Sequence, residues 1–71
     1  MPNSLSEIIR EVESLLSTAE KSYYSRKDTL LSFAVLCEAM ALFYNALTKK
    51  EQEKYPKLKH RLEKFEEFII L

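Results

Sequence analysis

The sequence contains no glycine and only two prolines among its 71 residues. Tight hairpins, phosphate-cradling loops and dinucleotide-binding turns need backbone at positive φ, which glycine adopts without steric cost. The lack of glycine therefore argues against these structures and the enzymes built on them. Since 46% of the residues are hydrophobic, the chain has enough apolar material for a core. An all-helical domain is what remains.

Cysteine and histidine are also scarce, with one of each. As the only cysteine, Cys37 cannot form an intramolecular disulfide. One histidine, His60, is not enough to build a Cys/His metal site. We therefore expect a reducing, cytoplasmic setting, with no metal and no cofactor. Cys37 lies in the most apolar part of the chain, which predicts a core thiol and not a nucleophile. His60 stands in a polar stretch without a pocket, so we expect no catalytic residue and no enzyme.

Neither sign of charge dominates, because the chain has eleven basic and eleven acidic residues. Residues 48–64 are locally basic, with seven basic and three acidic side chains. The acidic interruptions favour a solvated or internally paired face over a nucleic-acid surface. The N-terminal residues lack a signal-peptide pattern, and no uninterrupted apolar stretch approaches the roughly 18 to 20 residues of a membrane span. We expect no membrane insertion.

Apolar residues recur at helical spacing in three segments, about residues 5–25, 29–48 and 55–70. The first begins at a capping box made by Ser4 and Glu7, and the second follows a predicted N-cap at Asp28. The second segment has very few polar residues, which is typical of a central bundle helix. The whole chain is therefore predicted to be a single all-α domain, a three-helix antiparallel bundle of up-down-up topology.

The start of the third segment has two possible positions. Pro56 fits the first turn of a helix, which places the start near Tyr55. A second capping box, Thr48 with Glu51, would start the helix earlier and require a kink at the proline. In both cases the polar stretch 49–56 is predicted to lie outside the core.

Three groups of residues follow one another in a pattern similar to that of a known family. They are Arg26-Lys27-Asp28, then Ala34, Ala41 and Tyr44, and finally Leu62-Glu63-Lys64-Phe65-Glu66-Glu67. Over about residues 8–71 the chain resembles the microtubule-interacting and trafficking (MIT) domain, a three-helix bundle with an alanine-rich second helix. The resemblance implies a non-catalytic module that binds helical or extended tails of membrane-remodelling ESCRT filament subunits in grooves between helices.

The resemblance further implies that a groove between the second and third helices takes an amphipathic helix. Its expected floor is apolar, and acidic residues beside it would meet a basic residue of the ligand. The floor residues are Val35, Leu42, Leu58, Leu62 and Phe65, and the acidic residues are Glu38, Glu63 and Glu66.

Self-association is the main alternative function. The chain ends on four apolar residues, Phe68, Ile69, Ile70 and Leu71, and the second segment is apolar on two sides. Together these exceed what a three-helix monomer readily buries, which favours a small homo-oligomer. A third interpretation is a helical subunit or chaperone of a larger assembly.

Overall fold

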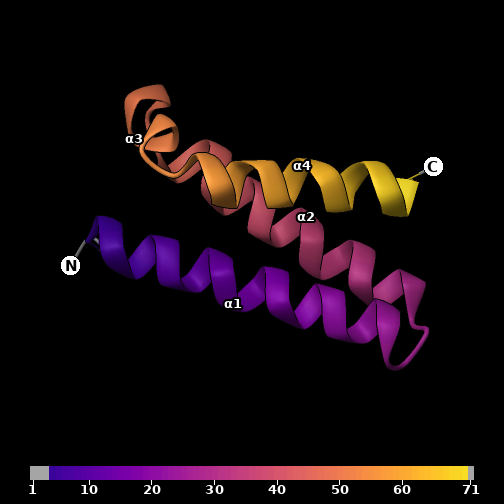
Figure 1. Ribbon diagram of the computed structural model, residues 1–71. Helices are drawn as coiled ribbons and strands as arrows, with labels where there is room; N and C mark the ends of the chain where they lie inside the picture. Colours follow the sequence, from indigo (N-terminus) through magenta and orange to yellow (C-terminus); the bar gives the residue numbers. More distant parts are fainter. Residues whose placement is uncertain (1–3, 71) are drawn as a thin grey trace.

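The computed structural model describes residues 4–70, and this part of the chain is all-α, without strands. Figure 1 shows its four helices, where the sequence predicted three. They are α1 (Leu5–Tyr24), α2 (Thr29–Ala46), α3 (Lys49–Glu53) and α4 (Pro56–Ile70). The all-α prediction is confirmed, and the number of helices is corrected to four.

The fourth helix arises because both start signals of the third segment are used. The Thr48 N–H donates to Oε1 of Glu51 at 2.8 Å, and the Glu51 N–H donates to Oγ1 of Thr48 at 3.2 Å. This complete capping box starts α3. Pro56 then starts α4, where its missing N–H costs no helical hydrogen bond.

The first two helices begin at side-chain caps. Oγ of Ser4 accepts the Glu7 N–H at 3.3 Å, and Oδ1 of Asp28 accepts the Leu31 N–H at 3.0 Å. These bonds satisfy amides that the first turn of a helix would otherwise leave unpaired.

The helices form two layers. α1 and α2 run antiparallel beside each other, and α4 turns back over one face of this pair, with α3 in the connection (Figure 1). The shortest dimension of the Cα trace is 16 Å, which accommodates two packed helices and no more. The opposite face of the α1/α2 pair is therefore uncovered by the described chain.

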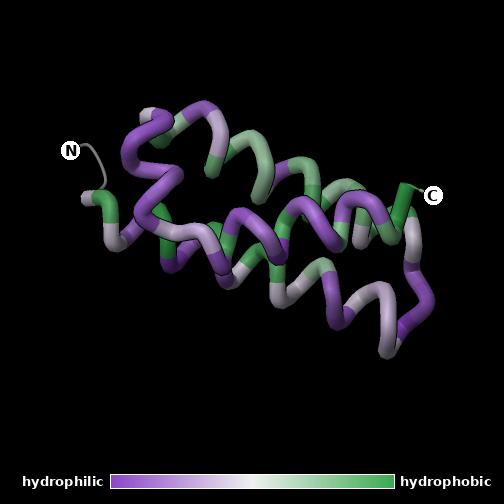
Figure 2. Tube along the Cα trace, turned by 45° about the horizontal axis from the view of Figure 1, so that its top comes forward, coloured by the Kyte–Doolittle hydropathy of each residue, from purple (hydrophilic) through white to green (hydrophobic). Residues whose placement is uncertain are grey.

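The core lies between the two layers and draws on α1, α2 and α4 and on Leu47, the C-cap residue of α2. Its buried apolar residues are Ile9, Val12, Leu16, Ala19, Leu36, Ala39, Phe43, Leu47, Leu58, Leu62 and Phe65. On α1 the buried line passes through Ile9 and Leu16, whereas Ile8 and Leu15 remain half-buried beside it. Figure 2 shows that α2, in contrast, is hydrophobic along most of its length and not on one side only.

Small buried residues let α1 and α2 approach closely. Ala19 and Ser22 of α1 and Ser32 and Ala39 of α2 are all at most 3% exposed. The Ser32 hydroxyl donates to the backbone oxygen of Asp28 at 2.8 Å, so its burial leaves no polar atom unpaired.

The link between α1 and α2 makes a turn that normally favours glycine. Lys27 has φ 58°, the only positive φ among residues 4–70. The Asp28 N–H donates to the Ser22 oxygen at 3.0 Å and the Ser25 N–H to the Lys21 oxygen at 2.8 Å, which closes the turn. The lack of glycine therefore did not exclude left-handed backbone, although lysine adopts it at an energetic cost of about 1–2 kcal/mol.

The polar stretch 49–56 contributes one buried side chain, contrary to expectation. Gln52 is only 8% exposed, and its Nε2 donates to the backbone oxygens of Leu47 at 3.1 Å and Tyr44 at 3.4 Å. These carbonyls belong to the C-terminal end of α2, where helical partners run out. Gln52 thus caps α2 from α3.

Gln52→Glu should destabilise the fold, because the carboxylate keeps the size of the side chain but loses both amide donors. We expect the free energy of unfolding in urea to fall by about 1–3 kcal/mol. The loss should shrink at low pH, where the protonated carboxyl can donate again. The control Glu53→Gln alters an exposed neighbour and should change stability by no more than about 0.5 kcal/mol. Equal effects of the two changes would contradict this role.

Candidate functional site

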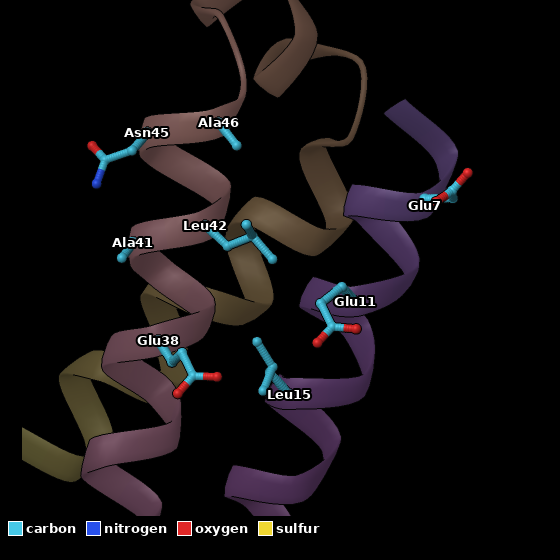
Figure 3. Close-up of a pocket in the computed structure, with 8 residues that line it drawn as sticks. All are labelled: Glu7, Glu11, Leu15, Glu38, Ala41, Leu42, Asn45 and Ala46. Atoms are coloured by element: carbon cyan, nitrogen blue, oxygen red, sulfur yellow. The ribbon is translucent and has the colours of Figure 1, made fainter. Parts of the chain in front are cut away.

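An open groove runs between α1 and α2 on the face away from α4 (Figure 3). We call it the acidic groove. Its lining residues are Glu7, Glu11 and Leu15 of α1 and Glu38, Ala41, Leu42, Asn45 and Ala46 of α2. It exists because α1 and α2 share one layer and α4 covers only the other face of that layer.

The floor of the acidic groove is apolar. Leu15 and Leu42 extend toward each other from the two helices (Figure 3), and both pack against the core while remaining half-buried. Ala41 and Ala46 are small, so they leave space beside the leucines. A further apolar side chain could complete the burial of this floor.

The rim of the groove is acidic on both sides. Glu11 and Glu38 point into the groove from opposite helices, while Glu7, one turn before Glu11, lies at its end (Figure 3). The one salt bridge within residues 4–70 joins Arg61 to Glu20, so the groove carboxylates have no basic partner there. Unpaired negative charge above an apolar floor attracts a positively charged ligand.

Three residues expected to floor a groove lie elsewhere. Leu58, Leu62 and Phe65 are buried in the core, with exposed fractions of 6%, 0% and 5%. They face inward because α4 packs this side onto the α1/α2 pair, so they do not floor an open groove between α2 and α4.

The three expected site residues of α2 lie in two different places. Glu38 and Leu42 lie in the acidic groove, and Val35 is half-buried on the core's edge. The sequence analysis missed Glu7, Glu11 and Leu15. Their spacing of four residues places them on one side of a helix, and this signal was present in the sequence.

The remaining expected residues, Glu63 and Glu66, lie beside α2 on the other side of the molecule. Partial burial raises the pKa of Tyr44, and the negative charges of Glu63 and Glu66 raise it further. The charges of these two carboxylates therefore affect Tyr44, on the side of α2 toward α4, and they do not belong to the acidic groove.

Replacing both carboxylates, Glu63→Gln with Glu66→Gln, should lower the pKa of Tyr44 toward its ordinary value. Ultraviolet titration of the phenol measures this, with Tyr44→Phe identifying its contribution. Because folding raises this pKa, the associated stability is present below about pH 10 and is lost as pH rises through the folded-state pKa. The control Glu53→Gln on α3 should leave the titration unchanged, and an unshifted Tyr44 in the double variant would contradict the arrangement.

Cys37 is exposed, so the prediction of a core thiol is wrong. α2 buries the side that carries Leu36, Ala39 and Phe43, and the next residue after Leu36 is turned by about 100° from it. No group of three or more metal-ligating side chains occurs in the described part of the chain.

The basic segment supplies a contact within the molecule. Arg61 donates to Oε1 of Glu20 at 2.7 Å and to the Ser17 hydroxyl at 3.4 Å, which ties α4 to α1. The hydrogen bond to Glu20 raises the pKa of Arg61. This residue of the basic stripe is therefore engaged internally.

α2 is long and apolar enough, by length and composition alone, to cross a membrane. Only 22% of this 18-residue span is buried in the structure. Core helices of soluble proteins have the same length and composition, so the significant feature is the large apolar surface that α2 leaves uncovered.

None of the protein-family models, curated proteins or solved structures compared with the chain matches it.

Proposed function

We propose that this chain is a non-catalytic protein-interaction module whose binding site is the acidic groove. The observation that carries the proposal is the half-buried pair Leu15 and Leu42 beneath carboxylates from both helices. An apolar floor with an acidic rim suits an amphipathic helix whose leucines face down and whose basic residues flank them. This function would be similar to that of the MIT domain, which binds helical tails in grooves between helices, with the ligand here between α1 and α2.

The ligand would lie along α1 and α2 as a further long helix. α1, α2 and α4 would then act as an up-down-up bundle, with α3 as an insertion in its second link, and the bound helix would complete a four-helix arrangement. This proposal places the module in the cytoplasm, where tails of other proteins are accessible.

The partner is a different protein because the exposed helical surfaces of this chain do not match the groove. The exposed apolar residues of α2, such as Leu30 and Phe33, have no basic residue among them. The exposed basic residues of α4, such as Lys57 and Lys64, have no exposed large apolar side chain between them. A ligand helix needs both properties on one face.

The interaction should be weak to moderate. Completing the burial of leucines contributes at most about 1.5–3 kcal/mol for each side chain. A short peptide must also order itself on binding, which costs about 2–5 kcal/mol. We therefore expect dissociation constants in the micromolar range or higher. These correspond to a binding free energy of roughly −8 kcal/mol or weaker.

Charge reversal tests the site without disturbing the core. An amphipathic peptide with leucines at i, i+3 and i+7 and flanking arginines should shift the backbone amides of Glu11, Leu15, Glu38 and Leu42. Glu11→Arg with Glu38→Arg should weaken binding at least tenfold, because the arginines of the peptide then meet positive charges on the rim of the groove.

A matched peptide with glutamates in place of the arginines should bind this double variant and not the original chain. Glu53→Arg, an exposed change on α3, serves as the control and should leave binding intact. Amide shifts confined to α4, or none at millimolar peptide, would overturn the proposed function.

A further inference from the structure

Six large apolar side chains remain substantially exposed in the described chain, with exposed fractions of 40–84%. All six lie at the end of the molecule where α1 ends, α2 begins and α4 ends (Figure 1). They are Tyr24, Leu30, Leu31, Phe33, Phe68 and Ile70. We call this surface the apolar end; the expected self-association residue Leu71 lies outside the described residues.

The apolar end is partly built on packed aromatic rings. Tyr24 stacks on Phe68 with ring centroids 5.9 Å apart, and Tyr23 meets Phe68 edge-on at 5.3 Å. Tyr23 also contacts the buried Phe65 at 6.0 Å, which connects the surface rings to the core. Tyr24 and Phe68 are therefore held in place by contacts that lead to the core.

The size of the patch fits half of a homodimer interface. Three of the six side chains are aromatic, and each aromatic side chain can bury about 150–250 Å². Together with the three aliphatic side chains, these exposures leave several hundred Å² of apolar surface. A typical monomer's largest patch is about 300–600 Å². A standard interface buries about 800 Å² per partner, of which about 65% is apolar in homodimers.

Charges of opposite sign lie at two edges of the apolar end. Arg26 and Lys27 occupy the exposed α1–α2 link, and Glu66 and Glu67 lie near the end of α4. In Figure 1 the link, the start of α2 and the last turn of α4 lie at the same end of the molecule, and Tyr24 at the end of α1 stacks on Phe68. The apolar end thus has a basic edge and an acidic edge.

We propose that a second copy of this chain docks on the apolar end and forms a two-fold symmetric dimer. In such an interface the same patch is used on both copies, so rotation brings the basic edge of each copy to the acidic edge of the other. A membrane with anionic lipids fits less well, because Glu66 and Glu67 would be repelled by it. The acidic groove lies toward the other end of the molecule, so both grooves of the dimer remain open.

Charge-reversal pairs test the two-fold arrangement directly by sedimentation or light scattering. The original chain has a mass of 8.4 kDa and should sediment as a dimer at tens of micromolar. Arg26→Glu with Lys27→Glu makes both edges acidic, and Glu66→Lys with Glu67→Lys makes both edges basic. Each variant alone should show a dimer dissociation constant raised at least tenfold.

An equimolar mixture of the two variants should recover the dimer, because every edge contact between unlike copies is then complementary. Lys49→Glu with Lys50→Glu on α3 makes the same charge change far from the patch and should keep the original mass. Leu30→Ser, at a residue 84% exposed, should separate the copies without loss of helix content measured by circular dichroism.

Three outcomes would overturn the dimer. They are a monomeric original chain at hundreds of micromolar, dimers unaffected by either charge reversal, and a mixture that stays monomeric. A monomeric chain that floats with anionic vesicles would assign the apolar end to membranes. None of these measurements depends on peptide binding, so the dimer and the acidic groove stand or fall separately.

Discussion

The close antiparallel pairing of α1 and α2 is the constraint on which the rest of the structure depends. Ala19 and Ser22 of α1 and Ser32 and Ala39 of α2 are all buried, and side chains this small let the two helices approach closely. α4 can then cover only one face of the pair. The other face keeps its leucines half-buried and its carboxylates unpaired, so the acidic groove follows from the same packing that closes the core.

The local signals in the sequence were sufficient to predict where helices begin. Ser4, Asp28 and Thr48 each accept an amide three residues later, and such bonds depend only on neighbouring residues. The two start signals around Pro56 were both recognised, but local chemistry could not show that both would be used. Local chemistry also could not show the burial of Gln52 against the end of α2, which needs contacts that no local pattern contains.

The sides that helices bury were harder to predict because α2 is apolar nearly all round. A helix with a single apolar stripe, such as α1, indicates its own buried side, here the line through Val12 and Ala19. For α2 the choice is made by its neighbours. Cys37 was therefore assigned to the core although it is exposed. The position of Leu62 was hard to predict for a related reason: it was expected on the floor of a groove, whereas it is fully buried where α4 packs on the α1/α2 pair.

The two ends of the molecule differ in a way that links the two proposed surfaces. The groove extends around Glu11, about thirteen residues before the end of α1, so its centre lies roughly 20 Å from the apolar end. In an end-to-end dimer the two grooves would be roughly 40 Å apart. A ligand with two amphipathic helices would occupy both most readily if a flexible linker of about 50 residues, or a shorter extended one, joined them. Within that limit the second helix would bind at a raised effective concentration, and weak single contacts would add up to a stable complex. Dimerisation would thus let two grooves of micromolar affinity together select partners by the spacing of their helices.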